Sequence, residues 1–232
     1  MKQLIFIIII ITAYITPSQS QSENFRNANP TRYIVGGTAY NLHQGTFLYK
    51  NTNLVLNTLT YGISNNFSLG VGTELLTPLL SHSSNRMPSL FIIAPKISNK
   101  MLTNVYISTG CEVACFPKGI GEDNTDDRIN ALISGYALTT FGTANNNLTV
   151  GIYTMGDDLE SMDDVFIYNL GGTIRFGRSF SIIAECFYLP GNFAILDTGM
   201  RLFGRHSTVD FGMMSYSDFP LSIPVVDFAW KF

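Results

Sequence analysis

The chain has 232 residues and a net charge of -3, and 46% of its residues are hydrophobic while only 13% are charged. Charged residues are about half as frequent as in a typical soluble domain, and there is no basic run that would indicate nucleic-acid binding. The length suits one large all-β domain. Composition leaves two alternatives, a weakly charged soluble β-sandwich and a barrel whose outer surface faces lipid.

The amino terminus has the features of a secretory signal peptide. Lys2 precedes a continuous apolar run, 4–11, and small residues follow that run. A short apolar run with these flanks is typical of a cleaved signal rather than of a membrane-spanning helix. We therefore predict that residues 1–20 are removed on export, that residues 21–31 form a flexible leader, and that residues 32–232 form an outer-membrane domain.

The rest of the chain predicts about twelve antiparallel strands of roughly ten residues, the length that a tilted strand needs to cross a bilayer. Short turns rich in Asn, Ser and Gly alternate with longer links, as in membrane barrels with short periplasmic turns and longer outer loops. The predicted fold is an all-β, transmembrane, antiparallel up-and-down β-barrel. The strands are expected near 32–41, 52–62, 67–77, 89–97, 101–111, 128–141, 147–155, 164–177, 179–189, 193–204, 206–215 and 222–232.

The last of these strands has two chemically different faces. One face carries Asp227 and Lys231, and the other carries Phe228, Trp230 and Phe232. Period-2 alternation is typical of a strand between two environments, and aromatic residues gather at the lipid headgroups of membrane barrels. We predict that these three aromatic residues lie at the membrane interface.

This segment resembles the closing strand of Gram-negative outer-membrane β-barrels, which end on an aromatic residue that the insertion machinery reads. The stretches 29–33 (Asn-Pro-Thr-Arg-Tyr) and 61–70 (Tyr-Gly-Ile-Ser-Asn-Asn-Phe-Ser-Leu-Gly) also look like those of exported, porin-like barrel proteins. The resemblance implies an outer-membrane location, with membrane lipid and the insertion machinery as partners. It implies no nucleic acid and names no solute.

Charged residues of the later strands share faces with small and polar residues, opposite the apolar faces. A charge facing lipid at mid-depth costs about 2–4 kcal/mol, so these charges are expected in the lumen. They would either select small solutes by charge, as in a narrow porin-like channel, or pair with one another to fill the interior of a structural barrel. The predicted network comprises Arg175, Glu185, Asp197, Arg201, Asp210, Asp227 and Lys231.

Catalysis and metal binding have little support. The segment 82–85 (His-Ser-Ser-Asn) resembles the His-x-Ser-Asn stretch of outer-membrane phospholipases, but Arg86 stands where that family has Gly. We predict no enzyme, and a lipid hydrolase using His82 and Ser84 remains the alternative function. Three His and three Cys without ligand spacing predict neither a metal nor another cofactor.

The cysteines leave one question open. If Cys111 and Cys115 lie on one extended strand, they are too far apart to form a disulfide. A loop between them would permit one. Cys186 is expected to be a free thiol facing lipid.

Overall fold

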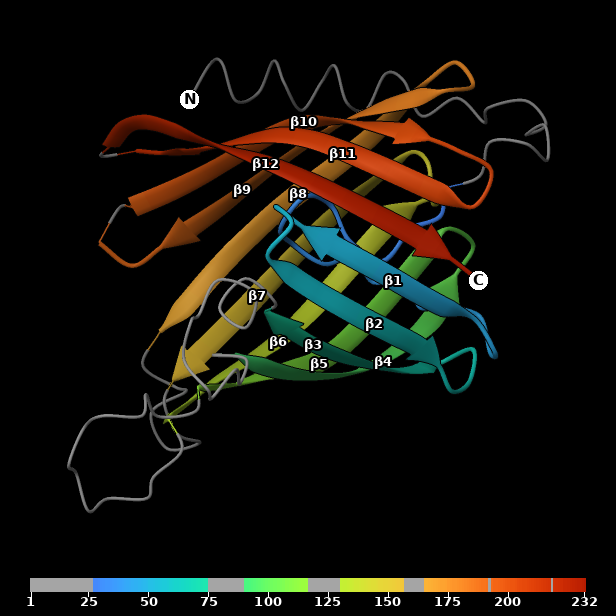
Figure 1. The fold of residues 1–232 in the computed structure, drawn as a ribbon, viewed down its shortest axis with the longest axis horizontal. Coiled ribbons are helices and arrows are strands. Elements are labelled where there is room, and N and C mark those ends of the chain that lie inside the picture. Colours follow the sequence, from blue (N-terminus) through green and yellow to red (C-terminus); the bar gives the residue numbers. More distant parts are fainter. Residues whose placement is uncertain (1–26, 75–89, 117–129, 157–164, 192, 218) are drawn as a thin grey trace, which may run out of the picture.

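The structure, a computed structural model, describes residues 27–74, 90–116, 130–156, 165–191, 193–217 and 219–232. Its twelve strands form one closed antiparallel barrel in which neighbours in sequence pair and β1 closes onto β12 (Figure 1). This confirms the predicted fold class. The strands are β1 (Phe47–Thr52), β2 (Leu56–Gly62), β3 (Phe67–Glu74), β4 (Phe91–Leu102), β5 (Val105–Phe116), β6 (Asn130–Gly142), β7 (Asn147–Gly156), β8 (Phe166–Phe176), β9 (Phe180–Leu189), β10 (Phe193–Phe203), β11 (Ser207–Tyr216) and β12 (Phe219–Lys231).

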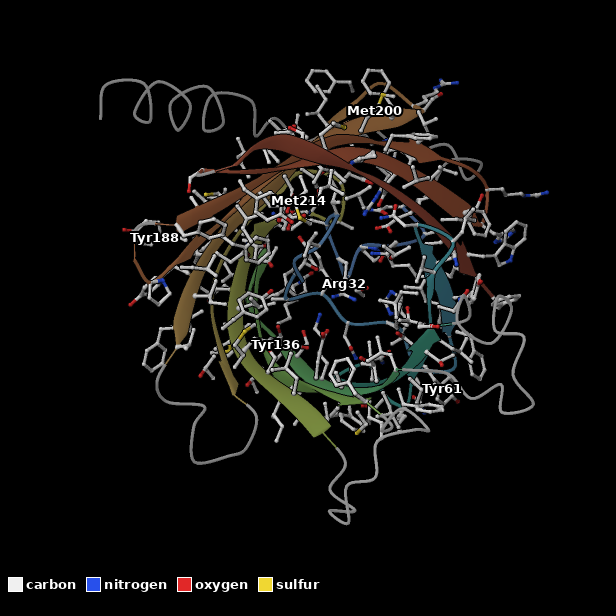
Figure 2. All side chains as sticks on the ribbon, turned by 60° about the vertical axis from the view of Figure 1, so that its left-hand side comes forward. Arg32, Tyr61, Tyr136, Tyr188, Met200 and Met214 are labelled. Carbon is white, nitrogen blue, oxygen red and sulfur yellow. The ribbon has the colours of Figure 1, made fainter. Side chains whose placement is uncertain are left out.

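The two faces of the barrel wall have opposite chemistry. In β8, Asn169 and Thr173 point inward and are buried, whereas Tyr168 and Leu170, on either side of Asn169, are exposed. Each of the twelve strands contributes at least one exposed large hydrophobic residue to the outside, and Tyr61, Tyr188 and Met200 point outward in Figure 2. Soluble monomers rarely expose an apolar surface of this extent, so the outer surface suits lipid.

The predicted first strand is wrong. Residues 32–41 form no strand, and β1 (Phe47–Thr52) lies almost entirely in 42–51, which was expected to be a link. Residues 27–42 instead form a loop inside the barrel, here named the lumen hairpin (Figure 2). Tyr33 and Ile34 are both buried although they are adjacent, which a strand with one buried face does not allow. The barrel still has twelve strands, because Phe47–Thr52 forms a strand that was not predicted.

The lumen hairpin enters and leaves at the same end of the barrel. The Asn27 side chain donates to Ala144 O in the β6–β7 turn, and the Asn41 side chain donates to Ser64 O in the β2–β3 turn. An isolated antiparallel bridge between Arg32 and Gly37 closes the inner end of the hairpin. Residues 27–31, which were expected to belong to a flexible leader, therefore line the interior.

Two connections also differ from the prediction. The expected turn at 98–100 is part of β4, and the chain turns at 103–104, where Asn104 has a φ of 61°. Asn is one of the few residues that adopt this backbone conformation readily. The β1–β2 connection, 53–55, is as short as the turns at the opposite end.

No helix long and apolar enough to span a membrane occurs in the described part of the chain.

The outward-facing surface can be tested at Leu170, which lies in the middle of β8 and is 43% exposed. We expect Leu170→Arg to destabilise the inserted barrel by about 2–4 kcal/mol, since it places a charge in the hydrocarbon region. Heat-modifiable gel migration and urea unfolding in lipid vesicles measure the effect. Leu170→Met is the matched control, and equal stability of the two variants would contradict this orientation.

Candidate functional site

The tip of the lumen hairpin is held by a carboxylate of the barrel wall. The backbone N–H groups of Val35 and Gly36 donate to the two Glu185 carboxylate oxygens, each at 2.7 Å. A Cβ on Gly36 would lie 2.6 Å from Glu185 Oε2, so the close approach requires glycine here. Hydrogen bonds to an ionised acceptor are about twice as strong as neutral ones. Glu185 thus acts as the main anchor of the tip.

Arg201 binds carbonyl groups of the hairpin backbone, whereas Glu185 binds its N–H groups. Its guanidinium forms a bidentate pair with Asp210, with both N–O distances 2.7 Å. The remaining N–H groups donate to the backbone oxygens of Asn29, Arg32 and Tyr33, at 2.5, 2.9 and 3.3 Å. Arg201 is 2% exposed. A single buried cation therefore joins a wall carboxylate to three carbonyl groups of the hairpin.

Two lysines that the sequence analysis did not select add to this attachment. Lys50 Nζ lies 2.6 Å from Asp227 Oδ2 and donates to Ile34 O at 3.3 Å. Lys96 Nζ donates to the backbone oxygens of Thr38 and Tyr40 at 2.6 and 2.7 Å. Lys50 was missed because its segment was assigned to a link. The signal for Lys96 was available, since it is a lone charge within an apolar stretch of a predicted strand.

Apolar contacts complete the fit of the hairpin. Ile34 packs beside Gly199 and Gly212, where an added Cβ would come within 2.7 and 2.6 Å of its Cδ1 atom. The Tyr33 hydroxyl contacts Asn147 Oδ1 at 2.5 Å and Thr149 Oγ1 at 2.8 Å. Burial, the largest cause, raises the pKa of Tyr33 well above its ordinary value, so this hydroxyl remains a hydrogen-bond donor.

The structure distributes the seven charges proposed for the lumen over three environments. Glu185, Arg201, Asp210 and Asp227 are buried in the interior and contact the hairpin or its anchors. Arg175 lies near the β8–β9 turn, where it donates to Asn145 and stacks 4.2 Å above the Phe203 ring. Lys231 is half-buried near the end of β12.

Asp197 occupies the third environment. It is 0% exposed and lies directly opposite Glu185 across the β9–β10 pair. Neither of its carboxylate oxygens has a hydrogen-bond partner among the described residues. A buried carboxylate beside a second carboxylate is unfavourable when both are ionised.

The three aromatic residues of β12 lie outside the barrel wall. Trp230 and Phe232 are exposed and Phe228 is half-buried, while Asp227 and Ala229, on either side of Phe228, are buried. Their rings follow one another along the strand, with centroid distances of 6.2 and 6.5 Å. This arrangement would suit contact with lipid headgroups.

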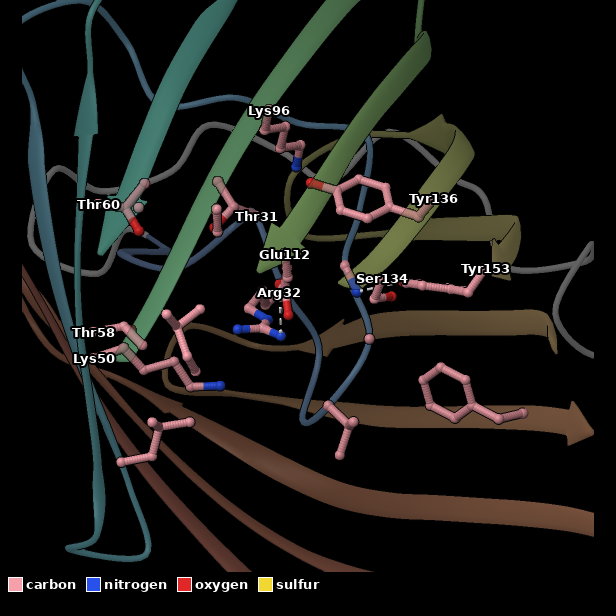
Figure 3. A pocket seen from close by; sticks show the side chains of 18 of the residues that line it. Thr31, Arg32, Lys50, Thr58, Thr60, Lys96, Glu112, Ser134, Tyr136 and Tyr153 are labelled. Atoms are coloured by element: carbon pink, nitrogen blue, oxygen red, sulfur yellow. Dashed lines mark hydrogen bonds and ion pairs between the residues drawn. The ribbon is translucent and has the colours of Figure 1, made fainter. Parts of the chain in front are cut away.

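A cavity of about 390 Å³ remains between the hairpin and the wall (Figure 3). Its polar lining includes Arg32 from the hairpin together with Lys96, Glu112, Tyr136 and Tyr153 from β4 to β7. Arg32 and Glu112 form an ion pair at 3.5 Å, and their side chains are 34% and 39% exposed. The Glu112 carboxylate, the largest influence, raises the pKa of Arg32. Water therefore has access to charged groups in the centre of the lumen.

The residues considered for catalysis and for disulfide formation can now be placed relative to the described part of the chain. His82 and Ser84 lie outside the described residues. Cys111 and Cys115 both lie in β5, and all three cysteines are free thiols. Cys186 is half-buried between the inward-facing Glu185 and Phe187, so it points outward as expected. No group of three metal-ligating side chains occurs within the ranges that the structure describes.

Comparison with known proteins defines the fold class. No protein-family model and no curated protein matches the sequence. KdgM porin in complex with disordered oligogalacturonate is similar in structure, with a TM-score of 0.56, 10% identity, and 81% of this chain and 98% of that chain covered. KdgM porin alone gives a TM-score of 0.55 at the same identity and coverage. The chain thus has the β-barrel fold of these porins, and its apolar outer surface suits contact with lipid.

Two of the three buried aspartates among the described residues, Asp197 and Asp210, provide a test of this electrostatic arrangement. We expect Asp197→Asn to raise the free energy of unfolding by about 1–3 kcal/mol, because it removes an unpaired buried charge. Asp210→Asn, the matched control, should lower it by about 3–5 kcal/mol, because it leaves the Arg201 guanidinium without its carboxylate. Urea unfolding followed by tryptophan fluorescence measures both. Effects of equal sign would contradict the assignment.

Proposed function

We propose that this protein is an outer-membrane, porin-like channel whose passage is closed by the lumen hairpin and opens when the hairpin shifts. The observation that carries this proposal is the manner of attachment. Side chains of the wall bind the backbone of the hairpin, as Glu185 does for Val35 and Gly36. The described hairpin shares no strand ladder with the wall. It can move without breaking a hydrogen bond of the barrel itself.

The charged cavity also supports a channel over a purely structural barrel. A structural barrel needs only a filled interior, in which charges pair completely. Here Arg32 and Glu112 face water at a long distance of 3.5 Å. A hydrated, charged opening beside a removable segment is a suitable path for a small polar solute.

The similarity to KdgM porin supports the fold of this chain but does not identify its solute. Oligogalacturonate is bound by KdgM porin, and at 10% identity this says nothing about the ligand of the present chain. We further propose that the protein has no catalytic role, that residues 1–20 direct its export, and that β12 is recognised by the barrel insertion machinery. None of the described residues supports the lipid hydrolase alternative.

Removal of the main anchor of the hairpin tests the channel. We expect Glu185→Gln to increase the open time in planar bilayers several-fold. The amide oxygen of Gln can accept only a neutral hydrogen bond from one of the two N–H groups, and the amide nitrogen leaves the other N–H group without an acceptor, a loss of about 1 kcal/mol or more. The measurement is single-channel current at a fixed potential, with heat-modifiable migration as proof of folding.

Arg205→Gln is the matched control, since it also removes one charge but from an exposed position in the β10–β11 turn. It should conduct like the wild type. If neither the wild type nor Glu185→Gln conducts, and deletion of residues 28–42 also fails to produce current, the barrel is structural and the proposal is refuted.

A further inference from the structure

Arg32 is positioned to bind a ligand in the centre of the lumen. Figure 2 shows it in the middle of the barrel, and its backbone oxygen is fixed by Arg201 at 2.9 Å. Within the described part of the chain, the hydrogen bond of its guanidinium is the long one to Glu112 at 3.5 Å. A guanidinium has five N–H donors in a planar fork that matches a carboxylate. Most of these donors therefore face the cavity.

Lys96 adds a second cation to the same cavity. Two of its three N–H donors are used by the carbonyl groups of Thr38 and Tyr40, which are neutral. Its charge has no carboxylate partner in an ion pair of the described residues. Arg32 and Lys96 against Glu112 leave one positive charge uncompensated at this end of the cavity.

The other acidic residue that borders the cavity does not cancel this charge at the site. Asp197, on β10, is buried beside Glu185, and β10 lies six strands round the barrel from β4, the strand that carries Lys96. Lys50, which also borders the cavity, is paired with Asp227 at 2.6 Å. The accessible charge therefore favours an anion.

Hydroxyl groups and aromatic rings surround the two cations. Tyr136 and Tyr153 lie side by side with ring centroids 5.6 Å apart, and Thr58, Thr60 and Ser134 border the same space (Figure 3). Aromatic faces offer apolar contact, and hydroxyls can both donate and accept hydrogen bonds. This combination suits a ring or short chain that carries hydroxyl groups. The volume, about 390 Å³, is within the range of small-molecule sites.

We infer that this cavity binds a small hydroxylated carboxylate, with its carboxylate on Arg32 and Lys96 and its hydroxylated body against Tyr136 and Tyr153. The inference rests on the proposed function, because it names the class of solute that the barrel would admit. Arg32 belongs to the lumen hairpin and Lys96 anchors it. Binding at this site consequently acts on the segment that closes the passage.

Three sugars that share one ring and differ in charge test the inference. Glucuronate is an anion, glucose is neutral and glucosamine is a cation. Isothermal titration of the folded barrel in detergent micelles should give glucuronate an affinity about ten-fold or more above the other two, as expected for a carboxylate on a guanidinium. Equal affinity for glucose would overturn the inference. Inorganic phosphate that competes as tightly as glucuronate would also overturn it, since the hydroxylated body would then contribute nothing.

Variants at the ion pair give effects of opposite sign. Arg32→Gln should weaken glucuronate binding about ten-fold, whereas Glu112→Gln should strengthen it, because the competing carboxylate is removed. Arg205→Gln, at an exposed turn, should leave it unchanged. Arg32→Lys retains the charge and loses the fork, so an intermediate affinity is expected and serves as the second variant if Arg32→Gln fails to fold. Unchanged binding in folded Arg32→Gln refutes the site.

The binding experiment and the conduction experiment can fail independently of each other. Glucuronate binding without any current in bilayers would refute the channel and retain the site. Current without glucuronate binding would refute the site and retain the channel.

Discussion

The lumen hairpin can exist only because the barrel wall satisfies its backbone. A peptide segment surrounded by protein still carries an N–H and a C=O at each residue other than proline, and each group left without a partner costs free energy. The hairpin closes only one bridge of its own, between Arg32 and Gly37. Charged side chains of the wall supply partners in its place, with Glu185 as an acceptor and Arg201 as a donor. The charges inside the barrel are thus largely determined by the polarity of the backbone that they face.

The hairpin also requires space beside the inner face of the barrel wall. Ile34 occupies the volume left by Gly199 and Gly212, and the Tyr33 ring lies against Gly171. Larger residues at these inward positions would fill the lumen directly, as in barrels whose interior is closed by their own side chains. The small residues therefore belong to the same arrangement as the charges, because they make room for a segment whose backbone the charges bind.

Much of the barrel could be predicted from sequence, because lipid on one side and a polar interior on the other impose a strict two-residue period. The strand Phe166–Phe176 shows this, as Asn169 and Thr173 alternate with Tyr168 and Leu170. The same rule identified Glu185, Arg201, Asp210 and Asp227 as inward-facing residues. It could not reveal that Lys50 pairs with Asp227 or that Glu185 binds a backbone, because periodicity specifies a face and contains no information about what lies opposite. Residues 32–41 were mistaken for a strand because they form an apolar stretch of strand length, although Tyr33 and Ile34 are adjacent and both buried, which is not the pattern of a strand with one buried face.

The seam of the barrel links closure to the hairpin. Five residue pairs join β1 to β12, whereas twelve join β5 to β6. The chain enters β1 four residues after the hairpin, and this closing strand carries Lys50, which donates to Ile34 O in the hairpin. A barrel that closed first would have to admit a folded loop through one of its ends. Assembly is simplest if the hairpin is laid against the inner faces of β6 to β11 while the sheet is still open, with β1 and β12 meeting afterwards around it.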